Sequence, residues 1–147
     1  MFKSADAILN RKQLANVVDD YFAAWQSHNT TLLRKIFKSN ARYIIRNKDS
    51  EMIGIDEIVA YWRRNKRRQH GLKLQWKIIS ITKGKSDVSF HAQFFDSEEA
   101  KSMHVGGIIN FYFDQKRKIS TLSEYYEKTY PKTDFAENKN TVAKVIS

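Results

Sequence analysis

The chain contains no cysteine, and this absence excludes disulfide bonds, catalytic thiolates and cysteine-based zinc sites together. A chain without thiols fits a reducing compartment. No apolar run approaches the ~20 residues that a membrane span needs, and residues 1–6 include no apolar core of the signal-peptide type. We therefore expect a cytoplasmic protein.

Glycine and histidine are also scarce. With five glycines, the chain has no Gly-rich phosphate loop. The four histidines show neither His-x-His nor His-Glu-x-x-His spacing, and they are His28, His70, His91 and His104. We therefore expect neither a metal ion nor a cofactor.

The residues that are abundant give a globular composition: 41% are apolar, 13% are aromatic and 29% are charged. A chain of 147 residues suits a single domain, and a domain of this size buries roughly 70% of its unfolded surface. The formal net charge of +10 would attract nucleic acid, anionic membrane or acidic metabolites. Charge alone therefore leaves several classes of partner open.

Three amphipathic helices are predicted from apolar residues at three- and four-residue intervals. The first, over residues 10–26, has the stripe Leu14, Val17, Val18, Tyr21, Phe22 and Trp25. Asn29 or Thr30 can cap a second, short helix. The third, over residues 56–69, should end at Gly71, which suits a left-handed C-terminal cap.

The end of the third helix carries the one dense basic cluster, which consists of Arg63, Arg64, Lys66, Arg67 and Arg68. These cations could bind phosphate or RNA by releasing counterions from a nucleic-acid backbone. No recognition motif accompanies them, and cations also suit the negative end of a helix dipole. We favour a solvated helix end, and nucleic-acid binding stays the alternative.

Five strands are predicted. One covers residues 41–47, and four consecutive strands cover residues 72–82, 87–95, 102–113 and 118–127. Short polar segments join the last four, as in antiparallel neighbours. In the strand over residues 102–113, a mostly apolar face alternates with a mixed one. A bent antiparallel meander packed against the helices is therefore expected.

The order of these elements, together with several short motifs, resembles the nuclear transport factor 2-like superfamily, and most of all its SnoaL-like, polyketide cyclase-like branch. The motifs are residues 21–25 (YFAAW), residues 37–41 (FKSNA), Gly54 ahead of Ile58 and Tyr61-Trp62, and Lys118-Ile119 leading to residues 124–126 (EYY). The similarity covers roughly residues 14–130. It implies an α+β cone in which a curved antiparallel meander sheet wraps three N-terminal helices, with a single domain over residues 1–130 and a polar tail over residues 131–147.

The resemblance also implies a pocket at the wide end of the cone. Carried over position by position, its residues are Tyr21, Trp25, Tyr43, Ile45, Ile58, Trp62, Phe90, Phe94, Ile109, Phe111, Leu122, Glu124 and Tyr126. This set is aromatic and largely apolar. It favours a small apolar or polycyclic ligand.

The family positions argue against two known chemistries. The two carboxyl groups of ketosteroid isomerases fall at Ile45 and Ile109 in this chain. The arginine and aspartate on the penultimate strand of limonene epoxide hydrolases fall at Gly107 and Ile109. Only the carboxylate of the last strand has a counterpart here, which is Glu124.

Glu124 is accordingly the best catalytic candidate. A carboxylate among apolar and aromatic side chains should have a raised pKa and serve as a general base. Tyr21 and Trp62 can each donate one hydrogen bond to a ligand oxygen. A register slip of one residue would instead turn Glu124 towards solvent.

We therefore expect a small-molecule-binding protein and, if it is an enzyme, a cofactor-independent isomerase, cyclase or hydrolase. The alternative is a non-catalytic ligand-binding or protein-interaction module of the same fold. The outer sheet face is expected to support a homodimer through His91, Gln93, His104, Asn110 and Tyr112.

Overall fold

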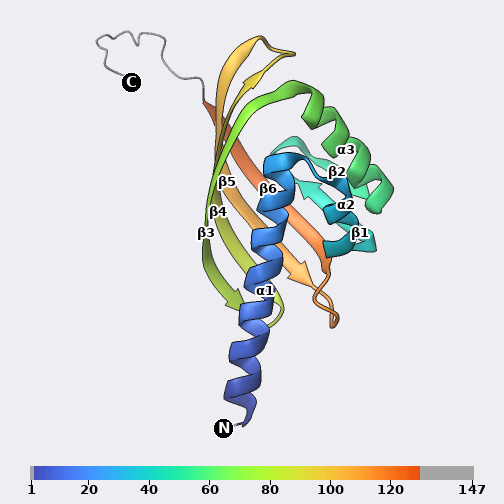
Figure 1. Cartoon of the computed structure of the whole chain (residues 1–147), viewed down its shortest axis with the longest axis vertical. Helices are drawn as coiled ribbons and strands as arrows, with labels where there is room; N and C mark the ends of the chain where they lie inside the picture. The colour runs from blue at the N-terminus through green and yellow to red at the C-terminus, as the bar shows by residue number, and fades with distance from the viewer. Residues whose placement is uncertain (1, 130–147) are drawn as a thin grey trace, which may run out of the picture.

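The computed structural model describes residues 2–129, with the side chains of residues 8–129. A curved six-stranded sheet forms one layer, and three α-helices lie on its inner side (Figure 1). The expected tail over residues 131–147 lies outside the described residues. Within residues 2–129, no helix is both long and apolar enough to cross a membrane.

The three predicted helices are confirmed as α1 (Phe2–Ser27), α2 (Thr30–Ile36) and α3 (Ile55–Arg68). Helix α1 begins well before the predicted start at residue 10. Its first turns project beyond the sheet (Figure 1), and Ile8 and Leu9 are 65% and 54% exposed. Ile8 and Leu9 therefore lie outside the buried stripe that begins at Leu14.

The residues predicted at the helix ends are confirmed in part. The Asn29 side chain caps α2 by accepting the N–H of Leu32 at 3.1 Å. Gly54 precedes α3 with a φ of 91°, a conformation that glycine adopts without a steric cost. Gly71 also has a positive φ, but the prediction that it caps α3 is wrong. The cap is Gln69, and Gly71 lies inside a strand where the pairing is irregular.

The predicted meander is confirmed as β3 (Gln69–Thr82), β4 (Lys85–Asp96), β5 (Lys101–Phe113) and β6 (Ile119–Thr129). The strand expected over residues 41–47 is β1 (Phe37–Ile45), and it pairs in parallel with β6. The sheet order is β2-β1-β6-β5-β4-β3, so the sheet is mixed.

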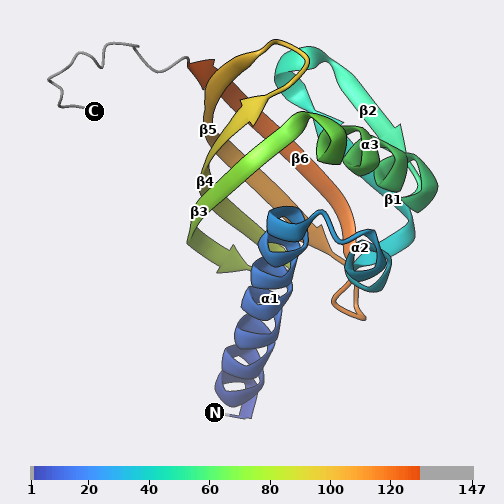
Figure 2. The ribbon, with the colours of Figure 1, turned by 45° about the horizontal axis from the view of Figure 1, so that its top comes forward.

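Two short elements after β1 were not predicted. A 3-10 helix, η1, covers Arg46–Lys48, and the edge strand β2 covers Ser50–Ile53. In β2, Met52 is the one buried residue, so neither a two-residue nor a helical period is visible in the sequence. These elements return the chain from the end of β1 to the start of α3 (Figure 2).

Gly107 permits the close approach of β5 and β6. An added Cβ at this position would lie 2.0 Å from the backbone oxygen of Tyr125. No side chain fits there, because the obstruction is backbone rather than a movable side-chain end. The sheet curls around the helices in this region (Figure 2), and this curvature positions the site described below.

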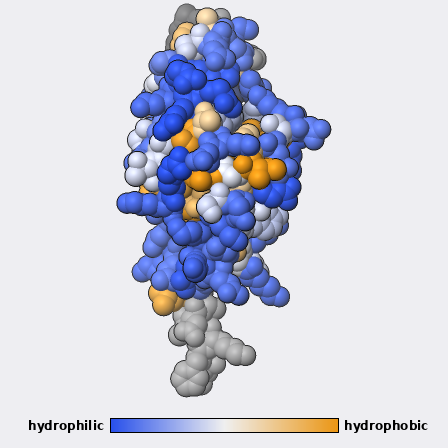
Figure 3. Space-filling view, turned by 90° about the vertical axis from the view of Figure 1, so that its right-hand side faces the viewer, coloured by the Kyte–Doolittle hydropathy of each residue, from blue (hydrophilic) through white to orange (hydrophobic). Residues whose placement is uncertain are grey.

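The core between helices and sheet is rich in aromatic rings. The Tyr21 ring lies within 6.4 Å, centroid to centroid, of each of its ring neighbours Phe22, Trp25, Phe37, Trp62 and Phe111. Burial of each large apolar side chain stabilises the fold by about 1.5–3 kcal/mol. The surface over α2, α3 and β2 is mainly hydrophilic, and a group of hydrophobic side chains gathers in its middle (Figure 3).

Candidate functional site

Glu124 lies on the inner face of β6. The strand pairs Glu124 with Ile45 of β1 and with Ile109 of β5, and both partners are buried. Because the side-chain period of a strand is two, this register turns Leu122, Glu124 and Tyr126 inwards together. Glu124 is 5% exposed, so the register slip that would place it in solvent does not occur.

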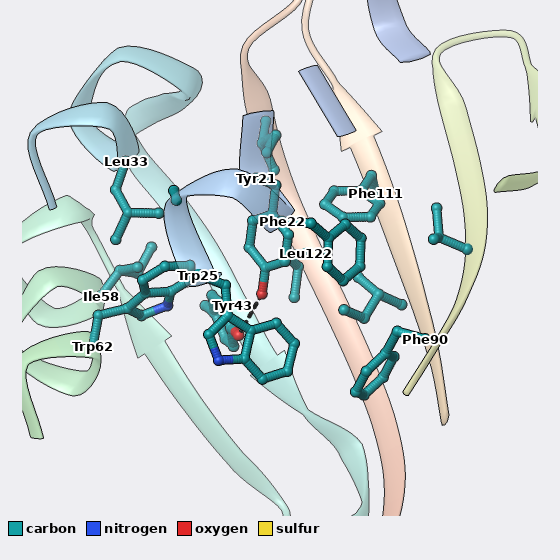
Figure 4. Close-up of a cluster of buried hydrophobic side chains, with 14 of the residues drawn as sticks. Tyr21, Phe22, Trp25, Leu33, Tyr43, Ile58, Trp62, Phe90, Phe111 and Leu122 are labelled. Atoms are coloured by element: carbon teal, nitrogen blue, oxygen red, sulfur yellow. Dashed lines mark hydrogen bonds between the residues drawn. The ribbon is translucent and has the colours of Figure 1, made fainter. Parts of the chain in front are cut away.

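Two tyrosine hydroxyls connect α1 and β1 to this carboxylate. The Tyr43 hydroxyl donates to Glu124 Oε1 at 3.1 Å, and the Tyr21 and Tyr43 hydroxyl oxygens are 2.9 Å apart. While Glu124 is ionised, Tyr43 donates its one proton to the carboxylate, so Tyr21 is then the donor of the second hydrogen bond. Figure 4 shows the two hydroxyls facing each other between α1 and β1. A relay therefore runs from Tyr21 through Tyr43 to Glu124.

Burial raises the pKa of Glu124 to about 7, although the hydrogen bond from Tyr43 and the charge of Lys48 oppose this shift. At neutral pH the carboxyl group is thus present in both its acid and its base form. Burial, followed by the charge of Glu124, raises the pKa of the Tyr21 and Tyr43 hydroxyls well above the ordinary value. Both tyrosines therefore remain hydrogen-bond donors.

Glu124 borders a cavity of about 90 Å³ that opens near the C-terminal ends of α1 and α3. Six of the predicted pocket residues line it, and they are Trp25, Tyr43, Trp62, Phe94, Glu124 and Tyr126. The other predicted residues are not part of the lining but belong to the buried core, namely Tyr21, Ile45, Ile58, Phe90, Ile109, Phe111 and Leu122. Their side chains fill the depth of the cone, so the cavity occupies only its wide end.

Tyr21 is the most consequential of these differences. The sequence predicted that its hydroxyl would hold a ligand oxygen, but the hydroxyl lies behind Tyr43 and is bonded to it. Trp62, in contrast, reaches the cavity from α3. Tyr21 is thus placed to support Tyr43, and Trp62 is placed to contact a ligand.

The cavity is also lined by residues that were not predicted to belong to the pocket, and most of them are polar: Lys48, Tyr61, Asn65, Arg68, Gln69, Asp96, Met103, Val105 and Lys128. Part of this set carried a signal. Tyr61, Asn65 and Arg68 recur at four- and three-residue intervals, so they share one face of α3 next to Trp62. The polar side of the pocket was therefore visible in the sequence as a second stripe on this helix.

A polar clamp forms one side of the cavity. The Arg68 guanidinium contacts the Asp96 carboxylate at 2.7 Å, and Asp96 also accepts the backbone N–H groups of Glu98 and Glu99. Burial alone would raise the pKa of Asp96, but these hydrogen bonds outweigh it and hold the pKa below its ordinary value. The clamp fixes the end of α3 to the link between β4 and β5.

This clamp also bears on the basic cluster. Arg68 is engaged with acidic residues, while Arg63, Arg64, Lys66 and Arg67 are exposed. Nucleic-acid binding by the cluster remains a prediction. Its test is an affinity that falls steeply with salt and is lost when Arg63, Arg64, Arg67 and Arg68 are replaced by Ala.

The outer sheet face has the predicted residues on it. His91, Gln93 and Tyr112 are exposed, whereas Phe90 and Phe94 on the alternate positions are buried. The rings of His91 and His104 lie 6.1 Å apart, and Asn110 donates to Asp87 at 2.6 Å. The homodimer through this face remains a prediction.

Comparison with solved structures identifies the class of fold to which this α+β cone belongs. The epoxide hydrolase/cyclase-like enzyme SalBIII of salinomycin pyran ring formation aligns with a TM-score of 0.69 and 12% identity over 79% of this chain and 92% of its own. A candidate SnoaL-like polyketide cyclase from Shewanella denitrificans aligns with a TM-score of 0.65 and 15% identity over 80% of this chain and 92% of its own. An NTF2-like protein of unknown function from Exiguobacterium aligns with a TM-score of 0.65 and 16% identity over 77% of this chain and 99% of its own.

The protein therefore has the nuclear transport factor 2-like fold, as the order of its elements predicted. No protein-family model matches the sequence, and no curated protein matches it. Identities of this size show a shared fold, and the similar structures differ in activity. The function must therefore be argued from the site.

Proposed function

We propose that this protein binds a small carbonyl-bearing molecule in the wide-end cavity and that Glu124 transfers a proton within it, as in an isomerase, a cyclase or a hydrolase without a cofactor. The observation that carries the proposal is a fully buried carboxylate whose pKa lies near 7 and which borders an open cavity. A purely structural carboxylate would be expected to carry a close ion pair, and Glu124 has none among the described residues.

The proposed step is simple proton transfer. The Glu124 carboxylate takes a proton from a carbon next to the ligand carbonyl, and the electron pair of that C–H bond moves onto the carbonyl oxygen. Donors on the cavity wall, such as the Trp62 indole N–H and the Asn65 amide, would stabilise the resulting enolate oxygen. Where the ligand carries a carbon–carbon double bond next to that carbon, the enolate is a dienolate, and return of the proton to its far carbon moves the double bond, gives an isomer and regenerates the carboxylate.

The cavity volume limits the ligand. About 90 Å³ is below the ~300–1,000 Å³ of pockets for drug-sized ligands, so a polycyclic ligand would require the cavity to widen. The same volume supports the second candidate, a non-catalytic binding module whose cavity is mostly filled by its own aromatic side chains. Proton exchange that depends on Glu124 favours the first candidate, whereas binding without exchange favours the module.

The experiment is hydrogen–deuterium exchange of small ketones and oxo compounds, including pyruvate, in D₂O, followed by proton NMR. We expect the wild-type protein to accelerate exchange at the carbon next to the carbonyl and Glu124→Gln to lose about 10²-fold or more of this acceleration. The matched control is Glu127→Gln, which removes an exposed carboxylate from the same strand. Unchanged exchange by Glu124→Gln would remove Glu124 from the proposed chemistry.

A further inference from the structure

Lys48 stands at the cavity beside Tyr126. It is the last residue of η1, and the preceding residue, Asn47, accepts the backbone N–H of Tyr126 at 3.1 Å. This hydrogen bond ties η1 to β6. The Lys48 ammonium lies 5.7 Å from the centroid of the Tyr126 ring, and both residues line the cavity.

Lys48 lies near the segment of β6 that carries Glu124. Tyr126 and Glu124 are two residues apart on the inner face of β6, which corresponds to about 7 Å along a strand. Lys48 and Glu124 both line the cavity, as does Tyr126, whose ring Lys48 faces. The Lys48 charge lowers the pKa of Glu124 and so opposes the effect of burial.

Lys48 also differs from the other cations of the cavity. Arg68 is paired with Asp96 and Glu98, and Lys128 is paired with Glu99. Within residues 2–129, Lys48 makes no ion pair. The cavity thus presents one cation whose charge is not already matched by a close carboxylate.

We propose that the cavity selects a short-chain oxo acid, with the ligand carboxylate on Lys48 and the carbonyl end at Glu124. This inference rests on the proposed function for the role of Glu124, and it adds the class of substrate. The volume agrees with a small ligand, since about 90 Å³ is well below the ~300–1,000 Å³ of pockets for drug-sized ligands. A small molecule bearing two polar groups at opposite ends fits this space and both side chains.

The proposal makes ligand binding depend on pH. An anion on Lys48 lies close to Glu124, so binding is favoured when Glu124 is protonated and weakens as the pH rises through about 7. The other groups that face Glu124 are the Tyr21, Tyr43 and Tyr61 hydroxyls, and burial raises the pKa of all three. The remaining charged lining residues are Arg68, Asp96 and Lys128, of which Arg68 and Asp96 neutralise each other.

The test compares pyruvate with pyruvamide, an uncharged molecule of nearly the same shape, by isothermal titration calorimetry with the full chain. We expect pyruvate to bind about tenfold or more tightly than pyruvamide, since a hydrogen bond to a charged group adds ~1.5–3 kcal/mol. Lys48→Met should abolish the difference, and Lys48→Arg should retain it. Lys77→Met, which removes an exposed lysine of β3 outside the cavity, is the control and should behave as wild type.

A second arm uses Glu124→Gln, which should bind pyruvate as tightly at pH 8 as at pH 6, whereas wild-type affinity falls over this range. Equal affinities for pyruvate and pyruvamide, no pyruvate binding, or an intact preference in Lys48→Met would each overturn the inference. The two proposals can fail separately. If the protein prefers pyruvate but exchanges no proton, the oxo acid site stands and the proton transfer is wrong. If it exchanges protons of neutral ketones but does not prefer pyruvate, the proton transfer stands and the oxo acid site is wrong.

Discussion

The Glu124 carboxylate accepts a hydrogen bond from the Tyr43 hydroxyl, and the charge of Lys48 acts on it without an ion pair. Removal of water from a carboxylate disfavours its charged form, and the hydrogen bond from Tyr43 offsets only part of this cost. The folded protein is therefore destabilised whenever Glu124 ionises. Such a group is expected where a ligand or a proton transfer makes use of it.

The pH dependence of stability should show this cost. The pKa of Glu124 is about 7 in the folded protein and 4.5 ordinarily, so between these values the folded state binds more protons than the unfolded state. The stabilisation is complete below about pH 4.5 and is lost as the pH rises to about 7. We expect Glu124→Gln to gain about 3 kcal/mol in unfolding free energy relative to wild type between pH 4.5 and pH 8.

Urea denaturation of both proteins across this range measures the difference. Glutamine retains an oxygen that accepts from Tyr43, so the relay persists in the variant. A constant difference between wild type and Glu124→Gln at all pH values would show that Glu124 titrates normally.

At the scale of elements, the site depends on how closely β5 approaches β6. Gly106 and Gly107 are neighbours in β5, but they differ in the space around them. An added Cβ at Gly106 would lie 3.5 Å from His91 Nδ1, which is an ordinary contact, whereas at Gly107 it would meet the Tyr125 backbone at 2.0 Å. Gly107 pairs with Tyr126, whose ring lines the cavity.

We predict that Gly107→Ala destabilises the protein by about 2–3 kcal/mol or more, because β6 must shift to admit the methyl group. Gly106→Ala should change the unfolding free energy by at most about 1 kcal/mol. Urea denaturation compares the two variants, and equal stabilities would show that Gly107 does not hold β5 and β6 together. The shift of β6 should also move Glu124, so the folded fraction of Gly107→Ala should bind cavity ligands more weakly.

At the scale of the whole molecule, the sheet has an inner side that the helices cover and an outer side on which none of the described helices packs. The outer face carries Tyr125 opposite Ile108, and Tyr125 is 43% exposed. Exposed apolar and aromatic side chains on one face are typical of an interaction surface.

We therefore predict that the protein forms a homodimer through the outer sheet face and that Tyr125→Asp converts it to a monomer, since a charge would be buried in the interface. Sedimentation velocity at several concentrations measures the state. Ile8→Asp, at an exposed position on α1 rather than on the sheet, is the control and should leave the dimer intact. A monomeric wild-type protein would exclude the outer face as a dimer interface.

The sequence by itself determined the three helices and the four-strand meander, whereas the register that turns Glu124 inwards was left open. These features depend on side-chain periods along a short segment, such as the stripe that includes Tyr21 and Trp25, and burial makes such periods visible in a sequence. The sequence did not reveal β2, which is too short to show a period. It also did not reveal the cap at Gln69, because the positive φ of Gly71 belongs to an irregularity in β3 and not to the end of α3.

Only the tertiary structure decided which of the inward residues border the cavity. Periodicity separates inside from outside, but it does not say how far the packed rings of Tyr21, Phe22 and Phe111 extend along the cone. It also cannot place Lys48 beside Tyr126 or join Tyr21 to Glu124 through Tyr43, because these contacts link segments far apart in the chain. The class of fold is therefore encoded in local pattern, while the chemistry of the cavity arises from long-range packing.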